Sequence, residues 1–409
     1  MAATKTFGYQ GRDARGKIVK GKVEAAGEAQ VLQRLRTLGV SPISIAEQGG
    51  GTGMQREIEI PGFTKRVTLK NLAVASRQMA TMLAAGLTLL RTLTILSEQT
   101  ENPKLAEVLG RVRADVETGS SLSDALRQHE LIFPRLMIHL VKAGETGGFL
   151  DGALQSIASN FESDVKLRQT IKSALTYPIA VLGMAFIAVI GMIVFIVPVF
   201  QGMFEDFGGD LPAPTQVLVT LSENAYWFVP ALIVAMVAFG VWWRANKHKD
   251  AVRSKVDVLV LKLPVFGDLF RKVAIARFSR NFATMMGAGV PVLQSLAIVG
   301  ETSGNWVIEN ALAKVQDSVR VGRSISGPLA EEPIFPPMVV QMVSVGEDSG
   351  SLEIMLTKVA DFYDEEVQST AESLTALIEP LMIGVIGAVI GGMIVALYMP
   401  VFTIFNEIG

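Results

Sequence analysis

The 409-residue chain offers few side chains that could carry out chemistry. It contains no cysteine, which excludes disulfides, thiolate metal sites and cysteine nucleophiles. Its three histidines, His129, His139 and His248, are too few for a multi-histidine metal centre. The sequence also lacks the Gly-x-x-x-x-Gly-Lys-Ser/Thr motif that binds nucleotide phosphates. We therefore expect no catalytic residue, no cofactor and no metal, and the protein is not expected to be an enzyme.

Two carboxylates are the most notable, because each follows a glycine at a break between apolar stretches. Glu145 lies in Gly-Glu-Thr-Gly-Gly-Phe-Leu at 144–150, and Glu347 lies in Gly-Glu-Asp-Ser-Gly-Ser-Leu at 346–352. The simplest interpretation is a turn carboxylate near a helix N-terminus, where the helix dipole stabilises it. The alternative is a partner contact or a site for a hard cation, although no known loop pattern supports a cation.

These two segments belong to an internal repeat. Residues 72–102 align without a gap with residues 275–305. Arg77 and Glu98 thereby correspond to Arg280 and Glu301. We expect these four residues to form salt bridges that organise a bundle, or to contact a partner.

The repeated units are predicted to be helical bundles. Apolar residues recur near helical spacing from Leu72 to Ile95, and breaks follow at Asn102-Pro103 and Phe133-Pro134. We expect five or six helices in each unit, at 67–176 and at 244–376.

Three charge-free apolar stretches, at 179–197, 228–241 and 381–399, are long enough to cross a bilayer. They predict membrane helices within 177–201, 226–243 and 377–404. Pro178 and Pro380 precede the first and third spans, which is compatible with a helix kink or restart. Gly387 and Gly391 form a Gly-x-x-x-Gly motif, for which close helix packing is the natural interpretation.

Basic residues indicate the orientation of the spans. The loop at 202–225 carries acids but no Lys or Arg, whereas basic residues follow from Arg244 onward. The positive-inside rule therefore places the N-terminus in the cytoplasm, and the loop and the tail at 405–409 outside. Spans without an ionisable residue make a poor transport path.

The first residues differ from the repeats. Residues 1–47 alternate in polarity around a short amphipathic stretch, which predicts a small β-β-α-β module in the cytoplasm. A glycine-rich linker follows at 48–66. The predicted fold class is thus a mostly α integral membrane protein with two repeated cytoplasmic helical bundles, three transmembrane helices and a small N-terminal α+β module. The net charge of −2 gives no reason to expect nucleic acid as a partner.

Several motifs in combination resemble the inner-membrane platform proteins of type IV pilus and type II secretion machines. The sequence of the second unit is more similar to the pilus proteins than to the secretion proteins. One departure is Glu379 before Pro380, where the first unit has Tyr177 before Pro178. The motifs are Ser-Arg-Gln-Met-Ala-Thr-Met at 76–82, Thr-Tyr-Pro at 176–178, Phe-Pro-Pro-Met-Val-Val-Gln-Met at 335–342 and Met-Pro-Val-Phe at 399–402.

The resemblance implies a platform in the cytoplasmic membrane. It implies that the bundles engage a hexameric assembly ATPase and, in pilus systems, a retraction ATPase. It also implies contacts with pilin subunits, pilus alignment subunits and membrane lipid, and a homo-oligomer, with a dimer favoured. Two other function classes stay open: a small transporter, which needs a polar membrane path, and a membrane-bound enzyme, which needs a catalytic constellation.

Overall fold

The computed structural model describes residues 5–12, 18–25, 30–31, 35, 41–47, 66–207, 212–247, 249–264 and 266–408. The chain divides into two compact units, Met1–Thr64 and Lys65–Gly409, and each is described by itself.

The first unit contains a three-stranded antiparallel sheet. Its strands are β1 (Lys5–Arg12), β2 (Ile18–Ala25) and β3 (Ser41–Glu47), in the spatial order β2-β1-β3. The central strand β1 pairs along its whole length with β2, from Lys5 opposite Ala25 to Arg12 opposite Ile18. Most of the segment predicted to be a helix, and the predicted linker up to residue 65, lie outside the described residues.

The second unit holds two bundles of six helices that follow each other in the same order. The first bundle ends in a helix that leaves it, and so does the second. The first set is α2 (Leu69–Ala84), α3 (Leu89–Gln99), α4 (Pro103–Glu117), α5 (Leu122–Arg127), α6 (Arg135–Gly147) and α7 (Leu150–Gly191). The second set is α12 (Phe266–Gly287), α13 (Val292–Thr302), α14 (Trp306–Arg320), α15 (Ser326–Ala330), α16 (Pro337–Asp348) and α17 (Leu352–Ile408).

Local sequence explains why the helices end at matching places. Gly148 and Gly350 separate the last two helices of each bundle, with φ of 75° and 68°. Only glycine adopts this left-handed conformation without steric cost, so each helix ends there and the long helix begins a few residues later. Asn102 and Asn305 likewise cap α4 and α14 by accepting backbone N–H groups.

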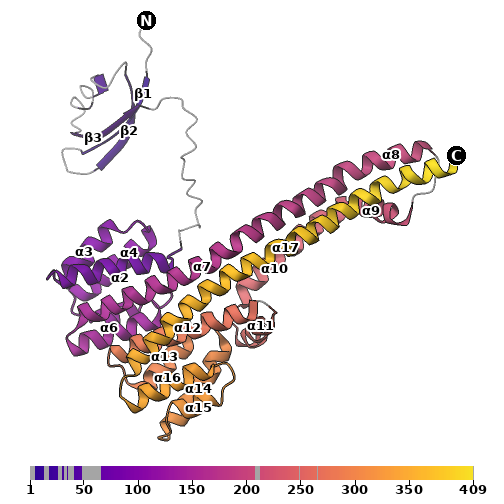
Figure 1. Ribbon diagram of the computed structural model, residues 1–409. Coiled ribbons are helices and arrows are strands. Elements are labelled where there is room, and N and C mark those ends of the chain that lie inside the picture. The colour runs from indigo at the N-terminus through magenta and orange to yellow at the C-terminus, as the bar shows by residue number, and fades with distance from the viewer. Residues whose placement is uncertain are drawn as a thin grey trace. The chain divides into compact units, whose positions relative to one another are not determined.

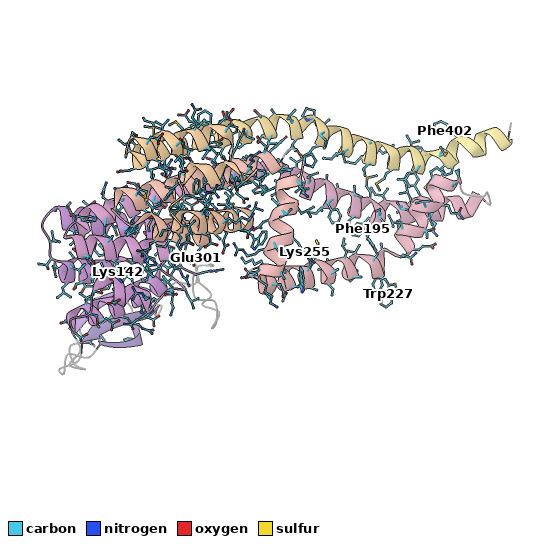
Figure 2. The ribbon with its side chains drawn as sticks, turned by 90° about the horizontal axis from the view of Figure 1, so that it is seen from below. Lys142, Phe195, Trp227, Lys255, Glu301 and Phe402 are labelled. Carbon is cyan, nitrogen blue, oxygen red and sulfur yellow. The ribbon has the colours of Figure 1, made fainter. Side chains whose placement is uncertain are left out.

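The two long helices, α7 and α17, run side by side from the bundles to the far end of this unit (Figure 1). A short π-helical segment, η1 (Met192–Ile196), and α8 (Val197–Phe207) continue the line of α7. Figure 2 shows Phe195 and Phe402 toward the far end and Lys142 among the bundles. The charge-free stretches predicted to span the membrane therefore lie in the parts of α7 and α17 that extend away from the bundles.

The return path between the long helices uses three further helices. They are α9 (Ala213–Glu223), α10 (Ala225–Asn246) and α11 (Asp250–Lys262). Among the described residues of this unit, three helices are long and apolar enough to cross a membrane: the one from Leu150, α10, and the one from Leu352. The predicted fold class, a helical membrane protein with two repeated bundles, is confirmed.

Pro178 and Pro380 do not restart a helix. Each lies inside a continuous helix, α7 or α17, and the chain keeps its helical course through both. A proline removes one N–H group and thereby frees one carbonyl, which a neighbouring helix can satisfy. The continuity makes each bundle and its span share one helix.

One apolar core extends through both bundles. Among the described residues it includes Leu93, Leu109 and Leu140 from the first bundle and Phe278, Leu312 and Leu356 from the second. A smaller cluster joins α7, α12 and α17 through Leu167, Leu269 and Val367. The two repeats are therefore packed together.

Candidate functional site at the joint between the two repeats

The two bundles meet where α7 of the first repeat contacts α12 of the second. Asn160 Nδ2 donates to Asn281 Oδ1 at 2.9 Å and lies 3.2 Å from Thr284 Oγ1. Both asparagines are buried. Since a buried amide without a partner costs free energy, this contact fixes the register of the two helices.

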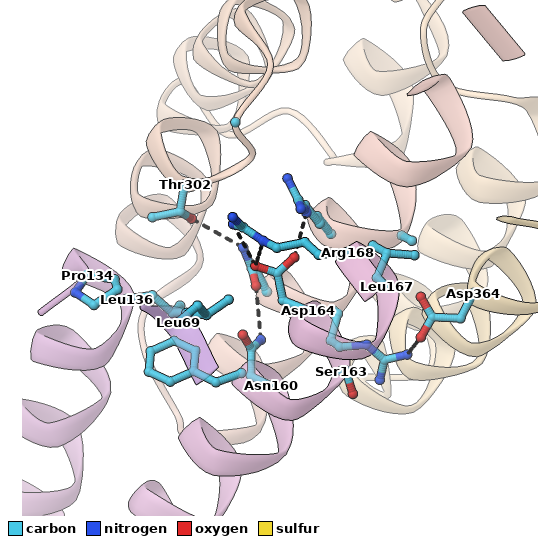
Figure 3. A pocket seen from close by; sticks show the side chains of 16 residues that line it. Leu69, Pro134, Leu136, Asn160, Ser163, Asp164, Leu167, Arg168, Thr302 and Asp364 are labelled. Atoms are coloured by element: carbon cyan, nitrogen blue, oxygen red, sulfur yellow. Dashed lines mark hydrogen bonds and ion pairs between the residues drawn. The ribbon is translucent and has the colours of Figure 1, made fainter. Parts of the chain in front are cut away.

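An ion pair lies one turn further along the same contact. Arg277 Nε donates to Asp164 Oδ1 at 2.8 Å, and Arg168 reaches Oδ2 of the same carboxylate at 3.0 Å. These side chains line a pocket of about 250 Å³ between the repeats (Figure 3). Burial lowers the pKa of Arg277, and nearby Arg168 lowers it further, whereas Asp164 opposes both. The joint thus depends on one carboxylate that serves two guanidinium groups.

A second contact joins α6 to α13. Arg135 Nη1 donates to Glu301 Oε2 at 2.5 Å, and Gln294 Nε2 lies 3.2 Å from His139 Nδ1. The hydrogen bond with Glu301 raises the pKa of Arg135. Burial lowers the pKa of His139, with further lowering by Arg127, Lys142 and Arg135, whereas Glu301 raises it. A neutral His139 can accept the amide N–H at Nδ1, and an imidazolium cannot.

The structure places the predicted arginines in pairs other than those with the predicted glutamates. Arg77 binds Glu162 of α7 through two bonds of 2.7 and 2.6 Å. Arg280 binds Asp364 of α17 at 2.6 Å and Asp361 at 3.1 Å. These are equivalent contacts inside each repeat. Arg77 does not pair with Glu98, nor Arg280 with Glu301, among the described residues, because each arginine points to the long helix of its own bundle.

Glu98 and Glu301 occupy equivalent positions with different surroundings. Glu301 binds Arg135 across the joint, whereas Glu98 is exposed on α3. Only one of the two predicted glutamates thus takes part in the contact between repeats.

Glu145 and Glu347 cap short helices in their own bundles. Glu145 accepts the backbone N–H groups of Leu122 at 2.5 Å and Ser123 at 3.1 Å, at the start of α5. Glu347 accepts those of Ile325 at 2.9 Å and Ser326 at 3.3 Å, at the start of α15. A carboxylate at this place satisfies donors that a helix start leaves free. The geometry favours the structural interpretation over a cation site.

The Gly-x-x-x-Gly motif is not packed by the described part of this chain. A Cβ atom added at Gly387 or Gly391 would meet no other atom within 4 Å. The close helix packing expected there is therefore not made by the residues that the structure describes.

Hydroxyl groups lie beside carbonyls that prolines free in the long helices. Pro400 cannot donate to Ala396 O, and Thr215 of α9 donates to that oxygen. Pro198 follows the π-helical turn and cannot donate to Ile193 O, to which Ser222 of α9 donates at 2.7 Å.

The Thr375 hydroxyl of α17 makes a similar contact near Pro178. Its Oγ1 lies 3.4 Å from Ala174 O, which Pro178 frees, and 3.0 Å from Ala371 O. These hydroxyls hold the long helices together where prolines interrupt their hydrogen bonds.

Sequence reasoning missed Asn160, Asp164, Arg277 and Asn281. A signal was present, because Val74 stands at the repeat position of Arg277 and Phe362 at that of Asn160. Positions where a repeat changes from apolar to polar mark surfaces that the two copies use differently.

Comparison with known families matches three stretches of the chain. The model described as type II secretion system (T2SS), protein F matches residues 75–198 and 278–400. The model of the N-terminal domain of type II secretion system protein F matches residues 1–46. The chain belongs to the type II secretion system protein F family. The two matched ranges correspond to the two bundles with their long helices, as the repeat predicts.

Relatives of this family fall under two names. A type IV pilus assembly protein PilC of Myxococcus xanthus is 41% identical over 99% of this chain and 96% of its own length. A PilC of Pseudomonas aeruginosa is 37% identical over 93% of this chain and 100% of its own. A type II secretion system protein F of Vibrio cholerae is 30% identical over 98% of both chains. The resemblance to pilus and secretion platform proteins is confirmed.

Proposed function

We propose that this chain is the non-enzymatic inner-membrane platform of a type IV pilus assembly machine. The observation that carries the proposal is the full-length similarity to pilus assembly proteins, at 41% identity for one of them, against 30% for a secretion protein. In this proposal the bundles lie in the cytoplasm and the loop between the first two spans lies outside. The polypeptide couples motor ATPases to the insertion of pilin subunits into the filament.

The two long helices support a mechanical role. Each begins in a bundle and continues without a break into an apolar span, so that a rotation or tilt of the bundle moves the span. The bundles present the surface for the assembly and retraction ATPases and for pilus alignment subunits. The spans, whose side chains are largely exposed within this chain, present the surface for pilins and lipid.

A second candidate function is the platform of a type II secretion system. It is favoured by relatives named as secretion protein F that match over nearly the whole chain, at 30 to 32% identity. The two candidates use the same structural argument and differ only in the exported filament subunit.

Deletion of the gene distinguishes the two candidates. We expect a deletion strain to lose surface filaments, to keep protein secretion, and to regain filaments with the wild-type gene. Lost secretion with normal filaments would move the assignment to the secretion platform. If neither changes, the platform function is wrong.

The proposed coupling of the protein to motor ATPases needs a separate measurement. Purified full-length protein in detergent should retain a pilus assembly ATPase from the same genome on an affinity column. The matched control is the same column loaded with an unrelated membrane protein. Equal retention on both columns would contradict the proposed coupling.

A further inference from the structure

The contact between the two bundles is asymmetric: each repeat uses a different face. Between the bundles, the first repeat contributes α6 and α7, and the second contributes α12 and α13. Further along α7, toward the apolar spans, α17 also contacts it. A two-fold relation would also bring α16 and α17 of the second repeat onto α2 and α3 of the first. The residues that would form this reverse contact are exposed instead. The relation is therefore head-to-tail.

The unused face of the first repeat lies on α2 and α3. Gln78 stands at the position of Asn281, Val74 at that of Arg277, and Glu98 at that of Glu301. All three are exposed, and Val74 has 49% of its surface free. We call these residues, together with Leu90 and Arg91, the α2–α3 face.

The unused face of the second repeat lies on α16 and α17. Phe362 stands at the position of Asn160, and Gln341 at that of His139. Both are exposed, and Phe362 has 43% of its surface free; Val345 of α16 is also exposed. We call these three residues the α16–α17 face. Within one chain, no described residue covers it as α7 is covered.

We propose that the α16–α17 face of one chain docks on the α2–α3 face of a second copy of this chain. The contact continues, between two chains, the interface that already joins the repeats within one. Continuity is the argument for this occupant, because the two faces occupy the same positions of the repeat as the two halves of the existing interface.

The intermolecular contact differs from the internal one in chemistry. The internal contact uses the pairs Asp164–Arg277 and Arg135–Glu301. At the equivalent positions the new contact places Glu366 beside Val74 and Pro337 beside Glu98, so neither ion pair recurs. Phe362, Val74 and Leu90 supply apolar area instead. Exchanging the partners would keep one ion pair in each contact, Glu366 with Arg277 or Arg135 with Glu98. It would leave Glu301 without Arg135, or Asp164 without Arg277, which disfavours the exchange.

The membrane decides how such a head-to-tail contact propagates. All copies of a membrane protein lie in one bilayer with the same orientation, so the operation that relates one copy to the next is a rotation about the membrane normal, without translation along it. A head-to-tail contact under such a rotation closes into a ring. We infer a ring in which internal and intermolecular contacts alternate.

Cysteine cross-linking in the full-length protein tests the contact, because the native chain contains no cysteine. Two differently tagged copies are co-expressed, one with Gln78→Cys and one with Phe362→Cys, and membranes are oxidised with copper phenanthroline. The equivalent internal pair, Asn160 and Asn281, is in hydrogen-bond contact at 2.9 Å. We therefore expect a disulfide-linked dimer that carries both tags.

A matched control keeps the result specific. Val321→Cys replaces Gln78→Cys, because Val321 is 77% exposed just after α14 and belongs to neither face. This control should give no mixed dimer. A Gln78–Gln78 dimer, a cross-link of either cysteine to a different protein, or no mixed dimer at equal expression would overturn the proposal.

Ring closure has its own readout. When every copy carries both Gln78→Cys and Phe362→Cys, oxidation should give products up to one defined largest size. An open ladder without an upper limit would overturn the ring. Because these readouts require neither filaments nor secretion, they can fail while the platform function holds, and the reverse is also true.

Discussion

At the scale of single residues, the carboxylates Glu145 and Glu347 act on stability. Each accepts backbone N–H groups at the start of a short helix in its own bundle. Replacing either with alanine leaves these donors without a partner. We expect Glu145→Ala and Glu347→Ala each to lower the free energy of unfolding by about 1–3 kcal/mol. Thermal unfolding in detergent measures the loss.

Glu98→Ala is the control for these variants. Glu98 is exposed on α3, so its removal should change the free energy of unfolding by no more than about 0.5 kcal/mol. Equal losses for Glu98→Ala and Glu145→Ala would show that the capping contacts contribute nothing specific.

Gly144 and Gly346 are needed for close contact at the start of each long helix. A Cβ at Gly144 would lie 2.6 Å from Ala153 Cβ, and one at Gly346 would lie 2.9 Å from Leu352 Cα. We expect Gly144→Ala and Gly346→Ala to destabilise the protein by about 1–3 kcal/mol, because the neighbouring helix must shift. The melting temperature of the purified protein reports the effect.

Gly110 offers a matched test of the opposite sign. It lies inside α4, where an added Cβ meets nothing within 4 Å. Gly110→Ala should stabilise the protein by about 0.5–1 kcal/mol, because alanine favours helix more than glycine does. A loss of stability in this variant as large as in Gly144→Ala would contradict the packing argument.

His139 makes the contact between α6 and α13 sensitive to pH. Its pKa is lowered in the folded protein, mainly by burial, so the folded state binds fewer protons than the unfolded state between the two pKa values. Stability should therefore rise with pH through this window. The contribution is complete above the ordinary pKa near ~6.5 and is lost as the pH falls through the lowered pKa.

A pH series of melting temperatures for wild type and His139→Gln tests this expectation. Glutamine stands at the equivalent position of the second repeat, Gln341, and does not titrate. The wild type should lose stability relative to the variant on acidification below pH ~6.5. Parallel curves would remove His139 as the cause.

At the scale of elements, α9 joins the far ends of both long helices. Thr215 donates to Ala396 O and Ser222 to Ile193 O, and prolines remove the normal donors to both oxygens. We expect Thr215→Val and Ser222→Ala each to cost about 0.6–1.7 kcal/mol, the range for hydrogen bonds between membrane helices. Unfolding of the protein in bicelles measures the loss.

Thr220 provides the control on the same helix. Its hydroxyl donates to Gln216 O of its own helix at 2.8 Å and is exposed. Thr220→Val should therefore cost less than either of the other two variants. The reverse order would mean that α9 does not hold the long helices together.

The sequence predicted the elements better than their contacts. Uninterrupted apolar runs and glycine-flanked breaks have local causes, so the helical bundles and the three apolar helices could be predicted from their residues. The partners of Arg77 and Arg280 could not be predicted, because Glu162, Asp361 and Asp364 lie far along the chain on the long helices. The effect of a proline on a helix could not be predicted from the sequence alone, because it depends on the side chains of the helices packed beside it. Pro178 and Pro380 stay within helices, and the carbonyl that Pro178 frees lies 3.4 Å from the Thr375 hydroxyl of another helix.

At the scale of the whole molecule, the long helices α7 and α17 make each bundle and its apolar span one mechanical element. The two elements are fixed to each other at three levels: the joint around Asp164, the Thr375 contact, and the α9 contacts at the far end. In the proposed function, motion that enters through a bundle therefore reaches the spans. This transmission is the central claim of the proposed platform function.

A break in one long helix tests that claim most directly. A short Gly-Ser segment is inserted between Thr176 and Tyr177 of α7, and the variant is returned to a deletion strain. The control carries the same segment after Gly51, in the glycine-rich stretch of the sequence. Surface filaments are counted at matched protein levels. The account predicts normal filaments with the control insertion and none with the insertion in α7. Normal filaments with both would contradict it.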